Sequence, residues 1–172
     1  MFQQKITYQR DPTNSTGLTA YVDADWAASL EDRKSISGYV IYLFNQIISW
    51  RTIKQKSISL STMESEYVAI SEAAKELLWL KRILQECAPL GCAIGTPTIY
   101  SDSQAAIAFT NSRIENARNR HIDIRYHFVK DLVDRGEMLM SFIPSKGNIA
   151  DMFTKPLPKP KFEELRDSVI QC

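Results

Sequence analysis

The sequence lacks several features that would place it in a functional class directly. Its 21 basic and 20 acidic residues almost cancel, so no overall excess of charge points to nucleic acid or to a membrane surface. No apolar run approaches the roughly 20 residues of a membrane span, and residues 1–12 lack the apolar core of a signal peptide. These absences favour a soluble, intracellular protein without a membrane partner.

Cysteine is also scarce. The three cysteines, Cys87, Cys92 and Cys172, are odd in number and show neither a CxxC pair nor a zinc-binding spacing. We therefore expect reduced thiols without a chemical role. What the chain does have is 44% hydrophobic residues over 172 positions, which is enough to bury one core and predicts one compact domain.

Hydrophobic periodicity predicts five strands and several helices. The predicted strands cover 18–26, 35–44, 47–53, 96–101 and 137–145, with Asn45-Gln46 as the turn of a hairpin. The predicted helices cover 61–86, 103–111, 122–136, a short segment from about Asn148, and 161–170. Three antiparallel strands followed by a strand–helix–strand section describe an α/β protein with a mixed sheet and helices packed on it.

Two acidic residues fall in or beside these elements in places that need a reason. Asp23 interrupts the first strand, and Asp25 points to the same face two residues later. For Asp23 taken alone, an exposed edge or a strand end is the better explanation. In the helix over 61–86, Glu66 lies in line with an apolar stripe, whereas Glu64 is expected on the solvent side. A carboxylate on a buried stripe is paired, protonated or bound to metal, unless the stripe emerges into water at the first turn.

Two further acids follow the late strands. Asp102 ends the fourth strand, where α/β sheets bind ligands, although a turn or helix cap would also explain it. Asp151 follows the fifth strand in the first turn of a short helix, where the helix terminus alone could account for it. Four acids that converge would repel one another and stay ionised only around cations. Oxygen ligands favour Mg²⁺ or Mn²⁺, and two such ions would support hydrolysis of a nucleic acid backbone.

Long motifs around these acids resemble the RNase H domain of copia-type (Pseudoviridae-like) retrotransposon polyproteins. They run in one order from about Tyr21 to Phe162: YVDADWA, DRKSISGYV, ISW, LSTMESEYVAISEAAKELLWL, IYSDSQAAI, RHIDIRYHFV and IADMFTKPLP. The resemblance implies a ribonuclease H-like fold over 21–157, with strand order 3-2-1-4-5 and an antiparallel strand 2. Residues 1–20 would then be a polar lead-in, and 158–172 a helical tail.

The same resemblance implies a function. Asp23, Glu66, Asp102 and Asp151 would bind two divalent metal ions, Mg²⁺ or Mn²⁺, and cleave the RNA strand of RNA/DNA hybrids to 5′-phosphate products. Asp25 is the less favoured alternative to Asp23. The expected partner within the parent polyprotein is a reverse transcriptase, and the expected setting is a cytoplasmic virus-like particle or the nucleus. The protein is expected to be a monomer.

Substrate contacts and one departure also follow from the resemblance. Gln104 matches a residue that reaches the minor groove of the hybrid, and Ser61 and Thr62 match polar positions that touch RNA. Helix capping explains Ser61 and Thr62 equally well. A mobile histidine expected before the last aspartate is absent, and neither His121 nor His127 is assigned its role. A structural role or a phosphate contact fits these two histidines better.

Local basic clusters offer a track for a phosphate backbone, with a solvated face as the alternative. Their members are Arg51, Lys54 and Lys56 beside the third strand, and Arg113, Arg118, Arg120, Arg125 and Lys130 later in the chain. Trp26, Trp50 and Trp79 are expected in the core. Two rival functions remain: a non-catalytic nucleic-acid or partner-binding module domesticated from a retroelement, and an integrase-type transferase. The transferase would require a third acid from a late helix.

Overall fold

A five-stranded mixed sheet forms the centre of the molecule. The computed structural model describes residues 6, 8, 17–87, 94–111 and 123–170. The strand order is β3-β2-β1-β4-β5; β2 is antiparallel to β1 and β3, while β4 is parallel to β1 and β5. This confirms the predicted sheet. The strands are β1 (Leu18–Asp25), β2 (Ile36–Leu43), β3 (Gln46–Lys54), β4 (Thr98–Ser101) and β5 (Leu139–Phe142).

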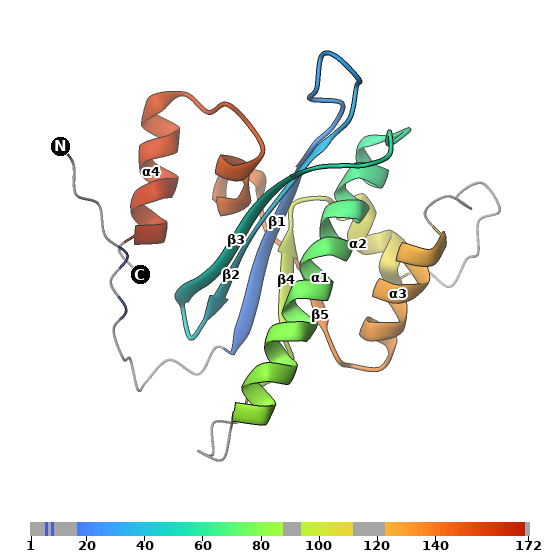
Figure 1. The fold of residues 1–172 in the computed structure, drawn as a ribbon, viewed down its shortest axis with the longest axis vertical. Coiled ribbons are helices and arrows are strands. Elements are labelled where there is room, and N and C mark those ends of the chain that lie inside the picture. The colour runs from blue at the N-terminus through green and yellow to red at the C-terminus, as the bar shows by residue number, and fades with distance from the viewer. Residues whose placement is uncertain (1–5, 7, 9–16, 88–93, 112–122, 171–172) are drawn as a thin grey trace.

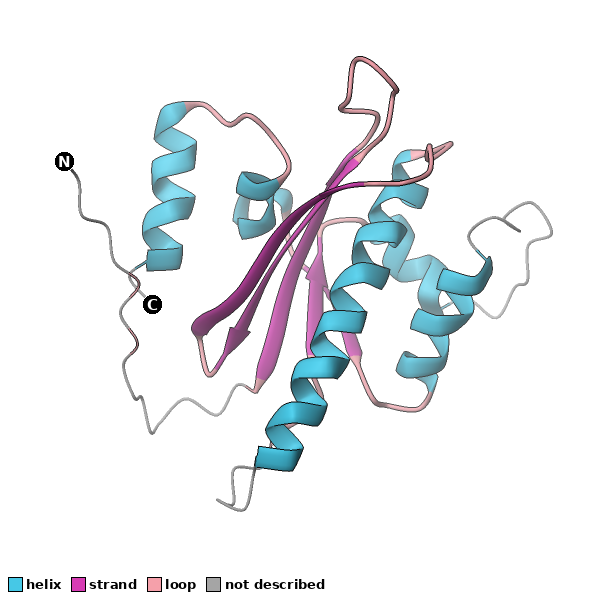
Figure 2. Cartoon of the chain, in the orientation of Figure 1, coloured by secondary structure: helices cyan, strands magenta, loops and turns pink. Residues whose placement is uncertain are grey.

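Helices cover both faces of this sheet. Figures 1 and 2 show the long helix α1 with α2 and α3 on one face, and the C-terminal helix α4 with a short helical turn on the other. The helices are α1 (Thr62–Cys87), α2 (Gln104–Asn111), α3 (Asp123–Asp134) and α4 (Lys159–Ile170), with 3₁₀ turns η2 (Ser145–Gly147) and η3 (Ile149–Phe153). None of the described helices is both long and apolar enough to cross a membrane.

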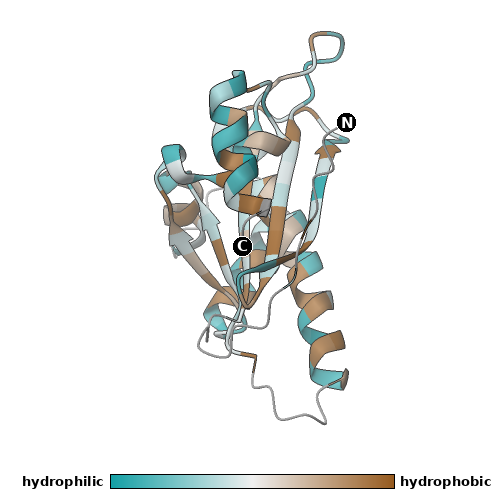
Figure 3. Ribbon diagram, turned by 90° about the vertical axis from the view of Figure 1, so that its left-hand side faces the viewer, coloured by the Kyte–Doolittle hydropathy of each residue, from teal (hydrophilic) through white to brown (hydrophobic). Residues whose placement is uncertain are grey.

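The two faces of the sheet bury different residues because side chains alternate along a strand. Leu18, Ala20 and Val22 of β1 join the larger core beneath α1. On the other face, Val40 and Tyr42 of β2 pack against Val169 and partly buried residues of η3, so α4 is packed on the sheet. In Figure 3 hydrophobic residues recur along the strands, and the helices carry hydrophobic and hydrophilic residues together.

The hairpin turn between β2 and β3 lies one residue earlier than predicted. Phe44 and Asn45 form it, with φ of 51° and 61°, and Gln46 already pairs with Leu43. Two-residue hairpin turns of this kind need positive φ at both central positions, and asparagine tolerates it well.

The prediction that the tryptophans lie in the core was wrong. Trp26, Trp50 and Trp79 are 45%, 51% and 56% exposed. Trp26 lies just beyond β1 and donates from Nε1 to the Ser59 carbonyl at 3.0 Å. Trp50 stands on the edge strand β3, and Trp79 on α1. Tryptophan has an apolar body and a polar edge, so its place in the sequence does not by itself decide burial.

Several sequence predictions lie outside the described residues. These are Cys92, Cys172, Arg113, Arg118, Arg120 and His121. Cys87, the remaining cysteine, is a free and exposed thiol at the end of α1.

Candidate active site

Three of the four predicted acids meet at one edge of the sheet. Carboxylate oxygens of Asp23, Glu66 and Asp102 lie within 4.8 Å of one another. Asp23 is 1% exposed and Glu66 is 6% exposed, so two of these carboxylates are withdrawn from water. Within the described residues, Asp25 does not belong to this group.

The parallel pairing of β1 and β4 explains why Asp23 and Asp102 meet. Tyr21 of β1 is paired with Tyr100 of β4, and each aspartate follows its tyrosine by two residues. The carboxyl ends of parallel strands lie at the same edge of a sheet, so both side chains are delivered to one place. Glu66 comes from α1, which packs against β1.

The start of α1 is held by reciprocal capping. The Ser61 hydroxyl accepts a hydrogen bond from the Glu64 backbone at 3.1 Å, and Glu64 Oε2 accepts one from the Leu60 backbone at 2.6 Å. The prediction that Glu64 faces solvent was therefore wrong: it is buried at 5% exposure because it serves as a cap. The capped first turns fix the helix that carries Glu66.

Gln55 ties the end of β3 to this helix start. Its side-chain nitrogen donates to Ser37 Oγ at 2.8 Å and to the Ser65 carbonyl at 2.9 Å, while its oxygen accepts from Ser59 Oγ at 2.8 Å. Sequence reasoning missed Gln55, because its partners come from three different segments.

Burial raises the pKa of two acids in the cluster, Glu66 and Asp23. Desolvation, with the nearby charges of Asp23 and Asp102, raises the pKa of Glu66 to about 9. Desolvation also raises the pKa of Asp23, against hydrogen bonds from Thr154 and Lys155. Glu66 Oε2 is buried without a hydrogen-bond partner among the described residues. An unpartnered buried oxygen beside two more carboxylates is the donor set that a hard divalent cation requires.

The fourth acid, Asp151, approaches the cluster through a lysine. Lys155 Nζ lies 2.6 Å from Asp151 Oδ1 and 3.0 Å from Asp23 Oδ1. Burial alone would lower the pKa of Lys155, but the hydrogen bond to Asp151 and the charge of Asp23 outweigh it, so the pKa lies above its usual range. Thr154 adds a hydroxyl hydrogen bond to Asp23 Oδ2.

Three residues without a predicted role hold the segment that carries Asp151. Asn148 is fully buried; its Nδ2 donates to the Val22 carbonyl at 2.9 Å and lies 3.5 Å from Asp102 Oδ1. The Thr52 hydroxyl donates to the Phe153 carbonyl at 2.8 Å.

Gly38 is the third of these residues, and it is paired with Asp23 across β2 and β1. A Cβ at Gly38 would meet Thr154 Cγ2 at 2.6 Å and Phe153 Cβ at 2.9 Å. The lack of a side chain at Gly38 is therefore what lets this segment lie against the sheet beside Asp23.

The predicted substrate contacts lie at two helix starts. Ser61 directly precedes α1, Thr62 is its first residue, and Gln104 is the first residue of α2. All three residues are exposed. The cap formed by Ser61 is present, which does not decide whether it also touches a ligand. His127 is exposed on α3, where its ring contacts Tyr126.

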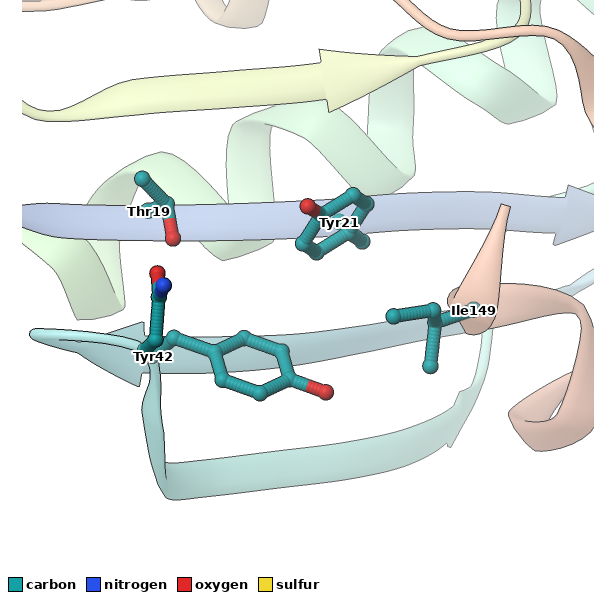
Figure 4. Close-up of a pocket in the computed structure, with 5 residues that line it drawn as sticks. Thr19, Tyr21, Tyr42 and Ile149 are labelled. Carbon is teal, nitrogen blue, oxygen red and sulfur yellow. The ribbon is translucent and has the colours of Figure 1, made fainter. Parts of the chain in front are cut away.

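Among the hollows formed by the described residues, two lie beside the sheet and differ in character. One of about 350 Å³ lies between β3, α1 and α3, and its lining includes Arg51, Lys54, Lys56, Lys75 and Arg125. The other, of about 210 Å³, is on the η3 face, where Tyr21, Tyr42 and Ile149 converge (Figure 4). The ring of Tyr21 also stacks on that of Tyr100, with the two ring centroids 5.1 Å apart. The first, which we call the basic hollow, is suited to anions because basic side chains outnumber acidic ones in its lining. The described lining of the second carries neither an acid nor a cation.

Sequence comparison finds retrotransposon polyproteins. The chain is 41% identical over 152 residues to the retrovirus-related Pol polyprotein of transposon TNT 1-94 from Nicotiana tabacum, covering 88% of this chain and 11% of the relative. It is 34% identical over 151 residues to the retrovirus-related Pol polyprotein of transposon RE2 from Arabidopsis thaliana, covering 87% of this chain and 10% of the relative. The chain thus spans about a tenth of the length of the curated relatives it matches. No family model matches.

Structure comparison finds ribonucleases H. The N-terminal RNase H domain of a Mycobacterium tuberculosis protein aligns with a TM-score of 0.58 at 11% identity, covering 89% of this chain and 98% of that one. LC11-RNase H1, isolated from compost, was solved in complex with an RNA/DNA hybrid. That structure aligns with a TM-score of 0.55 at 13% identity, covering 80% of this chain and 93% of that one. The protease–reverse transcriptase of prototype foamy virus aligns with a TM-score of 0.54 at 13% identity, covering 99% of this chain and 22% of that one.

These comparisons and the sheet order define a domain of the ribonuclease H fold. Its sequence relatives add the particular family. The chain belongs to the Pol polyproteins of copia-type retrotransposons, of which it matches the segment with this fold.

Proposed function

We propose that the chain is a metal-dependent endoribonuclease that cleaves the RNA strand of RNA/DNA hybrids. The observation that carries this proposal is the convergence of Asp23, Glu66 and Asp102 at one sheet edge, with an unpartnered buried oxygen on Glu66. A cluster of buried like charges destabilises a fold unless a cation compensates it. A binding module would have no use for such a cluster, and this argues against the non-catalytic alternative.

Each acid has a distinct role in the proposal. Asp23, Glu66 and Asp102 would hold one cation, and Asp23 with Asp151 would hold the second. Two bound divalent cations, Mg²⁺ or Mn²⁺, would supply an activated water and stabilise the leaving oxygen. The burial of Asp23 and Glu66 keeps these carboxylates out of bulk water, and opposite charges attract more strongly in such a low-dielectric site than in water.

The basic hollow supports a nucleic acid substrate. Its five Arg and Lys side chains come from β3, the segment after it, α1 and α3, against one acid, Glu72, which pairs with Lys75 at 2.7 Å. The hollow is therefore a local positive surface on a nearly neutral chain. Phosphate contacts of this kind position a duplex without reading its bases. Exposed Ser61, Thr62 and Gln104 would then contact sugars and the minor groove, which allows selection of RNA by its 2′-hydroxyls.

The test is cleavage of a labelled RNA/DNA hybrid in Mg²⁺ or Mn²⁺. The wild-type chain should cut the RNA strand to 5′-phosphate products and spare the DNA strand and a DNA duplex. Asp102→Asn should lower the rate by at least about a hundredfold, because it removes a charged ligand from the cluster. Asp131→Asn, an exposed position on α3 that pairs with Arg135, is the matched control and should cut normally.

An intact RNA strand with both metals would mean that the catalytic proposal is wrong. If the hybrid were then bound but not cut, the domesticated binding module would become the better account. Equal cutting by wild type and Asp102→Asn would point instead to a contaminating nuclease.

The biological setting belongs to the same proposal. The relatives are Pol polyproteins, and the foamy virus structure joins a matching region to a reverse transcriptase. We therefore propose that the chain degrades the RNA template during reverse transcription, beside a reverse transcriptase domain of its parent polyprotein. That reaction would take place inside the cell, in virus-like particles or in the nucleus.

A further inference from the structure

Lys155 is the component of the site that the carboxylates alone do not explain. Its ammonium lies between Asp151 Oδ1 at 2.6 Å and Asp23 Oδ1 at 3.0 Å. Asp23 is almost fully buried, whereas the Lys155 side chain is 35% exposed. An ammonium is a compact cation with three donors and no acceptor, so it can bridge two carboxylates as a metal ion does, although it carries only one positive charge.

We propose that Lys155 is an internal counter-ion that holds the position between Asp23 and Asp151, and that a divalent cation binding both carboxylates must displace it. Among the described residues, no cationic side chain bridges the neighbouring position at Asp23, Glu66 and Asp102, where Glu66 Oε2 is buried without a hydrogen-bond partner. Cations should therefore bind in order, first at Glu66 and Asp102, then beside Asp151. The inference depends on the proposed function only because it requires these acids to bind divalent cations.

The local structure allows the side chain to leave without unfolding the segment. The Lys155 backbone nitrogen donates to the Asp151 carbonyl at 3.0 Å, and the Thr154 hydroxyl remains on Asp23. The backbone is thus fixed, while a flexible four-carbon stem carries the charge. Displacement needs a rotamer change toward solvent, which the partial exposure of the side chain permits.

Titration with Mn²⁺, followed by the EPR signal of the free ion, tests the inference without a substrate. The wild-type protein should bind one ion well and a second more weakly. In Lys155→Met the second step should tighten by about tenfold or more, the scale of a charge-assisted hydrogen bond. The first step should tighten less than the second, because Lys155 contacts one acid of the first position, Asp23, but both acids of the second. Lys155→Arg, which keeps a cation there, should retain the weak second step.

Lys146→Met is the matched control. It removes one positive charge from an exposed position near Asn148. Both binding steps should stay within about twofold of wild type in this variant. Equal tightening of both steps in Lys155→Met, or no tightening of either, would overturn the inference.

A measurement on the wild-type protein keeps the inference testable if Lys155→Met folds poorly. NMR with isotope-labelled lysine, assigned through Lys155→Arg, can follow the Lys155 Cε–H signal during a Mg²⁺ titration. The signal should move with the second equivalent of bound ion. Movement with the first equivalent, or none through saturation of both steps, contradicts the proposal.

The same data separate this inference from the proposed function. Two bound ions, a cleaved hybrid and an unmoved Lys155 signal would refute the role of Lys155 and leave the ribonuclease intact. Ordered binding that depends on Lys155, with an uncut hybrid, would support the counter-ion and refute the nuclease. Absence of any bound ion would refute both.

Discussion

Replacing Glu66 by glutamine should stabilise the metal-free protein at neutral pH. Burial beside Asp23 and Asp102 raises the pKa of Glu66 from 4.5 to about 9. Between these values the unfolded chain has released the Glu66 proton while the folded protein keeps it. The unfolded state then binds fewer protons, so the free energy of unfolding falls as pH rises. Below pH 4.5 both states are protonated and the dependence vanishes.

The size of this effect follows from the same pKa shift. From pH 4.5 to pH 7, about 1.4 kcal/mol per pH unit amounts to a loss of about 3 kcal/mol in wild type. Glutamine has no proton to release, so Glu66→Gln should match wild type at pH 4.5 and exceed it at pH 7. For a domain of this length, this difference in the free energy of unfolding at pH 7 corresponds to a difference of roughly 6–12 °C in Tm between the two proteins. Asp23, whose pKa is also raised, contributes in the same direction in both proteins.

Thermal unfolding by circular dichroism in EDTA, across this pH range, measures the gap. Glu86→Gln, at an exposed position on the same helix, is the control and should follow wild type. Saturating Mg²⁺ should reverse the order, because bound cations stabilise the protein with its full set of carboxylates. Parallel Tm curves for wild type and Glu66→Gln in EDTA would show that Glu66 is ionised in the folded state, which refutes the reasoning.

Two further predictions concern the surroundings of the acids. Gly38→Ala would place a methyl group under 3.0 Å from Thr154 and Phe153, so we expect the free energy of unfolding, measured in urea, to fall by about 1–3 kcal/mol. An unchanged urea midpoint would mean that the segment around Phe153 accommodates the methyl group without strain. Lys56→Ala should reduce the slope of log affinity for a hybrid against log salt concentration by about one, because it removes one phosphate contact from the basic hollow. Lys159→Ala, on α4 and paired with Glu163, should leave that slope unchanged, and equal slopes for all three proteins would remove the hollow from the substrate path.

Local patterns were sufficient for much of the fold. The alternation in β1, the capped 3.6-residue pattern of α1 and the short parallel section around β4 each lie within one stretch of chain. They bring Asp23, Glu66 and Asp102 together because strand ends and helix faces follow simple periodicities. The strand order came from the family resemblance, since order of elements alone fits several folds.

The parts that sequence reasoning missed depend on contacts between distant segments. Glu64 was placed on the solvent side because the helical wheel ignores caps, which fold a side chain back over the first turn. Lys155 lies in a recognised motif, but its neighbours Asp23 and Asp151 become visible only when η3 is placed on the sheet. The tryptophans were misplaced because hydrophobic character alone does not decide burial.

The contacts that close the site also set the order in which it can form. Asn148 reaches Val22 across 126 positions, and Lys155 reaches Asp23 across 132. Contacts at such sequence separations cost more loop-closure entropy than local ones, so we expect them to form late in folding. During synthesis, Asp23, Glu66 and Asp102 emerge well before the segment that completes the site. If the chain is the proposed ribonuclease, it should therefore be unable to cleave RNA during synthesis until translation has passed residue 155.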